Sequence, residues 1–149
     1  MKAIYFDMDG TIASLYDYEN WLPLLKASDV SPYLYCSPRV KCIDFINIIN
    51  KIKAKGIKVG IISWTAKGGS KEYNKEVRKA KMQWIKNHFG NIFDEYHIIK
   101  YGTSKHSVAT IKNSILVDDD INVRSKWNGQ TIDASNCVEM INELKMIAA

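Results

Sequence analysis

The chain has 149 residues, enough to bury one hydrophobic core, so we expect a single domain over residues 1–149. Its three cysteines have no metal-ligand spacing, which argues against a disulfide framework and favours reduced thiols. No apolar run reaches the length of a membrane span and the N-terminus predicts no leader, so we expect a cytoplasmic protein without a membrane partner, in the host cytoplasm if a phage encodes it. The net charge of +5 favours anionic ligands, including nucleotides and nucleic acid, although it is equally typical of a lysine-rich surface.

Segments with the apolar pattern of a strand alternate along the chain with segments that have the apolar period of a helix. Lys2–Phe6 predicts a first strand, and Val40–Lys55 carries apolar residues at a helical period and ends before Gly56. Because strands and helices alternate throughout, we expect a three-layer α/β/α, Rossmann-like fold with a central parallel sheet. The further elements, in chain order, are a strand Ile57–Ser63, a helix Tyr73–His88, a strand Glu95–Ile99, a helix from Thr103 or Ser104 to Lys112, a strand Ser114–Val117, an edge strand Gln130–Ala134 and a last helix opened by a capping box of Asn136 and Glu139.

Two carboxylates follow the first strand. Asp7 and Asp9 leave the sheet at the edge where open α/β folds bind ligands, and Gly10 allows a sharp turn that Thr11 can hold by hydrogen bonding. Two desolvated carboxylates repel each other unless a cation joins them, and oxygen ligands of this kind suit Mg²⁺. The alternative is an acidic strand end followed by an ordinary turn.

A second acidic group follows the fourth strand. Asp118, Asp119 and Asp120 come directly after the apolar run Ile115–Val117. Acids also favour the positive end of a helix dipole, so a helix N-terminus is the alternative, and Asp120 fits that position. Together with the two carboxylates of the first strand, this group predicts a divalent-metal site at one edge of the sheet, where Ser63 also lies.

These segments resemble the motifs of the haloacid dehalogenase (HAD) superfamily. The run Asp7–Thr11 is similar to its first motif, Ser63 to its second, Lys105 to its third and the Asp118–Asp119 pair to its fourth. The start Asp-Met-Asp-Gly-Thr-Ile-Ala resembles small bacterial and phage members akin to deoxyribonucleotidases. The resemblance implies the HAD fold, with a small cap insertion at about residues 13–39.

The same resemblance implies a role for each matching residue. Asp7 would attack phosphorus to form an aspartyl-phosphate, and Asp9 would act as the general acid and base. An acid at this second position is typical of phosphatases and mutases, whereas ion-transporting members have threonine there. Mg²⁺ would be held by Asp7, the backbone carbonyl of Asp9 and the Asp118/Asp119 pair, of which either could be the direct ligand. The substrate-binding residues would be Thr11, Ser63, Trp64 and Lys105.

The position of the third motif has two candidates. Lys105 opens the helix before the acidic strand, as the family expects, and would be catalytic by orienting the nucleophile and the phosphate. Lys100 competes with it in this lysine-rich chain. We expect His106 to lie on the helix surface rather than to act in catalysis.

The substrate that we expect depends on the residues of the segment 13–39. Its aromatic side chains could stack on a nucleobase or form the small core of the insertion itself. The basic stretch Lys67–Lys86 could be a phosphate-attracting flap or a solvated helix face. The aromatic residues of the segment are Tyr16, Tyr18, Trp21, Tyr33 and Tyr35.

We therefore predict a Mg²⁺-dependent phosphomonoesterase that acts on a nucleotide or related small phosphate. A small cap leaves the site open, so a second subunit could close it and a homo-oligomer is expected on that ground. One alternative is a phosphatase for nucleic acid ends, which the open site and the basic surface would favour. Another is a protein that binds a nucleotide or a signalling molecule without turning it over, although binding alone has no need for the acid at Asp9.

Overall fold

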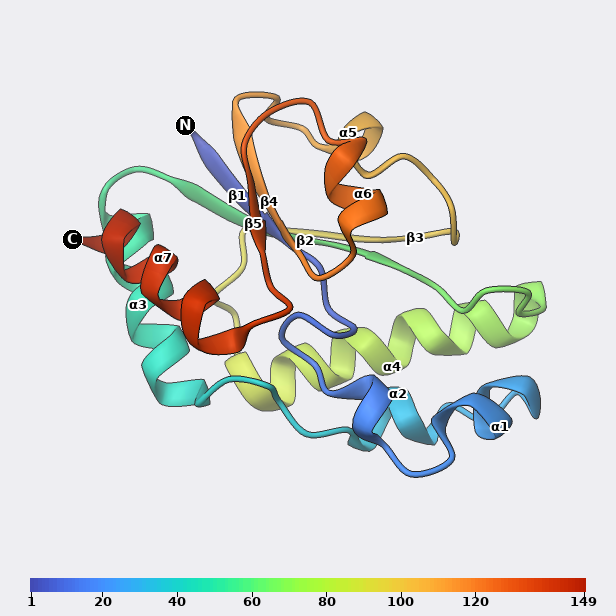
Figure 1. Ribbon diagram of the computed structural model, residues 1–149. Coiled ribbons are helices and arrows are strands. Elements are labelled where there is room, and N and C mark those ends of the chain that lie inside the picture. Colours follow the sequence, from blue (N-terminus) through green and yellow to red (C-terminus); the bar gives the residue numbers. More distant parts are fainter.

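Five parallel strands form one sheet in the order β3-β2-β1-β4-β5 in this computed structural model, which describes residues 1–149 (Figure 1). The central strand pairs on both sides, so that Phe6 lies beside Ile61 of one neighbour and Val117 of the other. The predicted α/β class with a central parallel sheet is therefore confirmed. The strands are β1 (Ala3–Phe6), β2 (Lys58–Trp64), β3 (Glu95–Ile99), β4 (Ser114–Asp118) and β5 (Thr131–Asp133).

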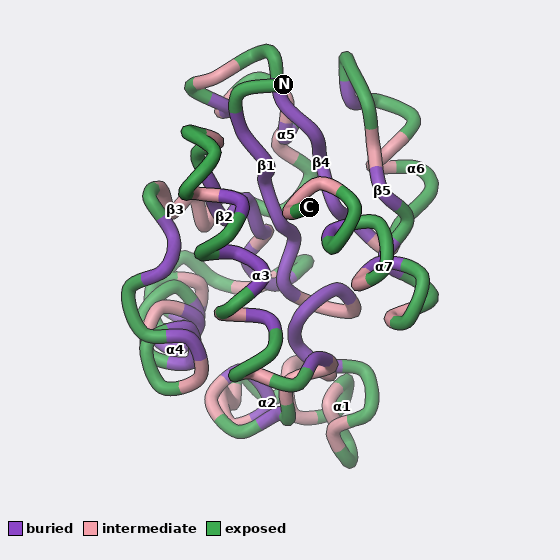
Figure 2. The backbone as a smooth tube through the Cα atoms, turned by 90° about the vertical axis from the view of Figure 1, so that its left-hand side faces the viewer, coloured by how far each residue is buried: buried purple, intermediate pink, exposed green.

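Helices cover both faces of the sheet. Side chains alternate along each strand, so apolar groups lie on both faces, and the helices bury them. Ile4 and Phe6 of β1 face the larger core, which α3 (Cys42–Ala54), α4 (Lys71–Phe89) and α7 (Cys137–Ala148) complete. Tyr5 points into the smaller core on the opposite face, beside α5 (Lys105–Val108) and α6 (Ile121–Ser125). Figure 2 shows β1 buried along its whole length between these layers. None of the helices is long and apolar enough to cross a membrane.

The helix predicted to reach Lys112 is wrong, because α5 ends at Val108. Ala109 is extended, and the next two residues bond to the sheet: Thr110 donates to Glu95, and the amide of Ile111 donates to the Tyr5 hydroxyl at 3.1 Å. These contacts hold the chain against side chains of β1 and β3, so it does not continue the helix. Other predicted helices have small shifts at their ends, and Asn136 caps α7 as expected by accepting from the amide of Glu139.

The segment 13–39 folds as three short helical pieces, η1 (Leu15–Asp17), α1 (Trp21–Lys26) and α2 (Ser31–Tyr35). Their apolar side chains form a small core with α4, in which Tyr33 is buried. The two ends of the segment meet: Ala13 forms an antiparallel bridge with Pro38, and the Ser14 amide donates to the Ser37 carbonyl at 2.8 Å. The segment therefore leaves and re-enters the sheet domain at one point.

Candidate active site

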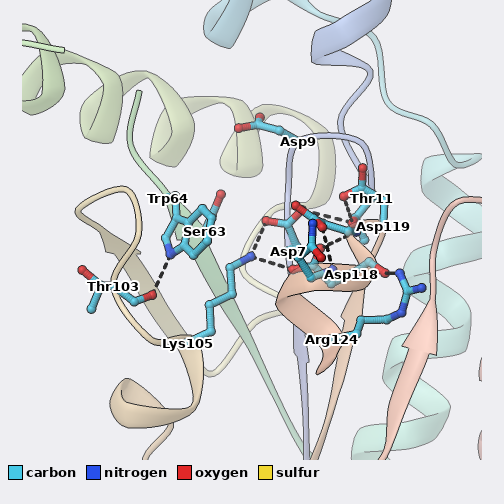
Figure 3. A network of polar contacts seen from close by, with 12 residues as sticks. Asp7, Asp9, Thr11, Ser63, Trp64, Thr103, Lys105, Asp118, Asp119 and Arg124 are labelled. Atoms are coloured by element: carbon cyan, nitrogen blue, oxygen red, sulfur yellow. Dashed lines mark hydrogen bonds and ion pairs between the residues drawn. The ribbon is translucent and has the colours of Figure 1, made fainter. Parts of the chain in front are cut away.

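Three carboxylates meet at the carboxyl edge of the sheet. Asp7 follows β1, Asp118 ends the neighbouring strand β4, and Asp119 comes next along the chain. Each residue offers one oxygen atom, and these three oxygens lie within 4.8 Å of one another (Figure 3). We call Asp7, Asp118 and Asp119 the carboxylate trio. Its assembly follows from the pairing of β1 with β4, which aligns the two strand ends.

One buried lysine pairs with two members of the trio. The Nζ atom of Lys105 lies 2.8 Å from Oδ1 of Asp7 and 2.7 Å from Oδ2 of Asp118. Burial alone would lower the pKa of Lys105, but the charges of these two carboxylates outweigh it and hold the pKa above its ordinary value. Lys100 is exposed and forms no ion pair, so only Lys105 of the two candidate lysines reaches the trio.

The trio carries more negative charge than Lys105 balances. Three carboxylates against one ammonium leave a charge that a divalent cation would offset. Burial and the neighbouring charge of Asp7 raise the pKa of Asp118 to about 6 and the pKa of Asp119 to about 7. An all-oxygen donor set with this surplus fits a hard cation such as Mg²⁺.

Asp9 lies apart from the trio, and its side chain points away from it (Figure 3). Its Oδ2 atom accepts a hydrogen bond from Nζ of Lys81 at 2.8 Å, and its Oδ1 atom has no hydrogen bond within the protein. Burial raises the pKa of Asp9, Lys81 opposes this shift, and the charge of Asp7 reinforces it. A carboxyl group in this environment is suited to hold a proton and then release it.

Ser63 and Thr11, both predicted to bind substrate, are fully buried behind the cavity surface. Ser63 accepts a hydrogen bond from Lys81 at 2.8 Å. The Thr11 hydroxyl lies 3.2 Å from Oδ2 of Asp7 and donates to it, with Asp119 at 3.5 Å as a second acceptor. Direct contact of Ser63 or Thr11 with a substrate stays a prediction, whereas their contacts with the site's charged groups are present.

A cavity of about 510 Å³ opens onto the trio, and Asp9 and Lys105 also line it. One wall comes from the segment 13–39, with Tyr16 and Trp21, and the other from the loops after β2 and β3. Trp64 lines this cavity, and its indole N–H donates to the Thr103 carbonyl at 2.9 Å, which fixes the ring; its contact with a substrate stays a prediction. The remaining wall residues include Thr65, Lys67, Tyr101, Leu22, Leu25, Lys26 and Tyr33.

Three residues of this region were not singled out from the sequence. Lys81 interrupts the buried stripe of α4, and a lysine on an apolar helix face was the available signal. Tyr101 follows β3 at the same edge as the other site residues, so strand order could have found it. Thr65 has a buried hydroxyl with no partner in the protein, which no sequence pattern reveals.

Arg39 ties the loop after β1 to the loop after β5. Its guanidinium donates to the carbonyl oxygens of Gly10 and Thr11 on one side and of Ala134 on the other, the last at 2.8 Å. The loop itself turns at Gly10, whose φ of +79° favours glycine. These contacts fix the backbone that carries Asp7 and Asp9.

A comparison of the sequence with models of protein families finds no match, and a search of curated proteins finds no similar sequence. What is established is an α/β protein with an all-parallel sheet, whose carboxyl edge carries a carboxylate trio, a buried lysine and a cavity. The function must be argued from that chemistry.

Proposed function

We propose that this protein is a Mg²⁺-dependent phosphomonoesterase of the HAD type, with the segment 13–39 as a small cap over the site. The observation that carries the proposal is the position of Asp7, which lines the cavity, belongs to the trio and pairs with Lys105 at 2.8 Å. A carboxylate next to a cation site and an ammonium can approach a phosphate dianion, because the cations offset their repulsion.

In the first step, a carboxylate oxygen of Asp7 forms a bond to phosphorus, and the bond from phosphorus to the ester oxygen breaks. Protonated Asp9 gives its proton to the departing oxygen, so the alcohol leaves neutral. Lys105 holds Asp7 in place during this attack through the 2.8 Å contact. The products of the step are an alcohol, an aspartyl-phosphate on Asp7 and an Asp9 carboxylate.

In the second step, the Asp9 carboxylate takes a proton from water, and the water oxygen attacks phosphorus. The bond between Asp7 and phosphorus breaks, which releases inorganic phosphate and restores both aspartates. Mg²⁺ bound by Asp7, the Asp9 carbonyl and the Asp118/Asp119 pair would neutralise charge on the phosphoryl oxygens. The high pKa of Asp9 supports its part in both steps.

The aromatic side chains of the cavity walls favour as substrate a nucleotide, or another phosphate ester whose alcohol carries a planar ring. Tyr101 packs against Trp64 with ring centroids 4.8 Å apart, and Tyr16 packs against Trp21 on the other wall at 5.0 Å. Tyr16 and Tyr101 are both exposed, so their rings are accessible to a ligand. Base stacking on aromatic side chains is worth about 1–3 kcal/mol per base in nucleic acid complexes.

The test is phosphate release from nucleoside monophosphates, sugar phosphates and 5′-phosphorylated oligonucleotides, with Mg²⁺ or EDTA. We expect turnover only with Mg²⁺, and we expect Asp7→Asn to abolish it, because the nucleophile is lost. Asp44→Asn is the matched control, since Asp44 is exposed on α3. Turnover that survives Asp7→Asn would exclude the aspartyl-phosphate route, and nucleotide retention without product would indicate a binding protein.

A further inference from the structure

Lys81 is a buried cation that the proposed chemistry does not yet use. Its side chain is 1% exposed, and it lies on the stripe of α4 that also buries Val77 and Trp84. An ammonium has three N–H donors, and three acceptors surround this one: Asp9 at 2.8 Å, Ser63 at 2.8 Å and the Trp64 carbonyl at 2.6 Å. Desolvation of such an ion offsets much of what its pairing gains, so stability alone does not explain it.

We propose that Lys81 is the positioning residue of the general acid and base Asp9. The ammonium holds Oδ2 of Asp9 against the end of β2, and this leaves Oδ1 free to contact a group in the cavity that Asp9 lines. The proposal rests on the proposed function for the role of Asp9. It adds how the orientation of that carboxylate is fixed.

Lys81 acts through Asp9 because it does not line the cavity, in contrast to Lys105. Its contacts join the loop after β1, which carries Asp9, to the end of the neighbouring strand β2. The Tyr33 ring covers the ammonium at 5.3 Å and closes it off from the side of the segment 13–39. The ammonium is therefore held from all sides, and its position fixes that of Oδ2.

This arrangement predicts an effect that depends on the leaving group. A nucleoside monophosphate releases a basic alkoxide, which needs the proton of Asp9, whereas 4-nitrophenyl phosphate releases a stable phenolate that does not. The ratio kcat/KM reports the first chemical step, in which the alcohol departs. We expect Lys81→Met to lower kcat/KM for the nucleotide by about 10²-fold or more, which is the usual contribution of general acid catalysis. The value for 4-nitrophenyl phosphate should stay within about threefold of wild type.

The control variant is Lys79→Met, which makes the same substitution at an exposed position of the same helix and should leave both substrates unaffected. A double-mutant cycle separates positioning from a general structural effect. Once Asp9→Asn has removed the acid, adding Lys81→Met should change kcat/KM by less than about threefold. Independent, additive losses, or equal losses on both substrates, would overturn the proposal.

A readout without turnover keeps the inference separate from the proposed function. A crystal structure of Lys81→Met should show the Asp9 carboxylate turned away from the position that it has in a crystal structure of the wild type. Titration with Mg²⁺ should give the same affinity for both proteins, because the trio is intact. An Asp9 carboxylate that stays in place in the variant overturns the positioning role, whether or not the protein is a phosphatase. A displaced carboxylate in a protein without any phosphatase activity would leave the positioning intact and refute the proposed function alone.

Discussion

The Nζ atom of Lys105 lies 2.8 Å from the Oδ1 atom of Asp7, although the two residues are 98 positions apart in the sequence. The same ammonium reaches Asp118 at 2.7 Å, so one cation stands between the ends of two neighbouring strands. Removal of this cation would leave both buried carboxylates without an ion-pair partner, and the cost should exceed that of removing an exposed lysine.

We predict that Lys105→Met lowers the free energy of unfolding of the metal-free protein by about 3–5 kcal/mol, the usual cost of breaking a buried ion pair. Lys100→Met is the matched control, because Lys100 is exposed and lies outside the ion pairs. Its effect should stay within about 0.5 kcal/mol. Urea denaturation in EDTA measures the free energy of unfolding of both variants. Equal losses for the two variants would contradict a stabilising role of the ion pairs that Lys105 forms.

The trio predicts an unusual dependence of stability on pH. The pKa values of Asp118 and Asp119, about 6 and about 7, lie above the ordinary value of 3.8, so the folded state holds these protons more tightly than the unfolded chain. The metal-free protein should therefore lose stability as pH rises from about 4 to about 7. Thermal unfolding in EDTA across this range checks the sign.

Mg²⁺ should reverse that trend, because a cation on the trio favours the ionised carboxylates. Its stabilising effect should grow as pH rises through the same range. The double variant Asp118→Asn/Asp119→Asn serves as the reference, since it cannot titrate at these positions. A Mg²⁺ effect that survives in this variant would place the ion elsewhere.

Gly10→Ala should cost stability and weaken Mg²⁺ binding. A Cβ atom at Gly10 would collide with the Asp119 carboxylate and lie 2.9 Å from the Tyr16 ring, so Asp119 must move. Gly56→Ala is a matched control, because Gly56 has a similar φ of +81° with open space around it. Both variants should lose about 1–2 kcal/mol from backbone strain, but only Gly10→Ala should weaken Mg²⁺ affinity in calorimetric titrations. Equal affinities would show that Asp119 is not a ligand.

Arg39→Gln should destabilise the protein more than Arg78→Gln. Arg39 donates to four carbonyl oxygens in two loops, whereas the exposed Arg78 donates to one. Loss of several charge-assisted hydrogen bonds at a partly buried site should cost about 2–4 kcal/mol. Urea denaturation at pH 7 compares the two, and a near-zero effect at Arg39 would mean that the loops hold their places without it.

Tyr101→Ala should raise KM for a nucleoside monophosphate by about tenfold and leave KM for glycerol phosphate unchanged, because only the nucleotide can stack on the ring. Tyr35→Ala is the control, since Tyr35 is 71% exposed and lies outside the cavity lining. An equal rise in KM for both phosphates would assign Tyr101 to the shape of the cavity rather than to base recognition.

The elements of the fold could be predicted because strand and helix periods in this chain are distinct. The edge position of Asp7, Asp118 and Asp119 followed from strand order alone, since parallel strands end at one edge. The end of α5 could not be predicted, because the hydrogen bond from Ile111 to Tyr5 spans 106 positions.

Contacts from distant helices were the second gap. Lys81 meets Asp9 across 72 positions, and its helix reads as a basic amphipathic segment whose lysines are mostly solvated. The one local sign of its burial is its place on the apolar face of that helix, together with Val77 and Trp84. The aromatic residues of the segment 13–39 also differ in burial, since Tyr33 is buried and Tyr16 is exposed although both line the cavity, and the sequence does not distinguish them.

The bridge between Ala13 and Pro38 has a consequence for how this protein could diversify. Because the segment starts and ends at one point, its length and sequence can change without altering the distance that the flanking chain must span. The carboxylate trio and Lys105 would stay at the carboxyl edge of the sheet, while the cavity wall that the segment 13–39 forms would change. Grafting a foreign loop between residues 13 and 38 would therefore change the wall of the cavity and leave the carboxylate trio in place.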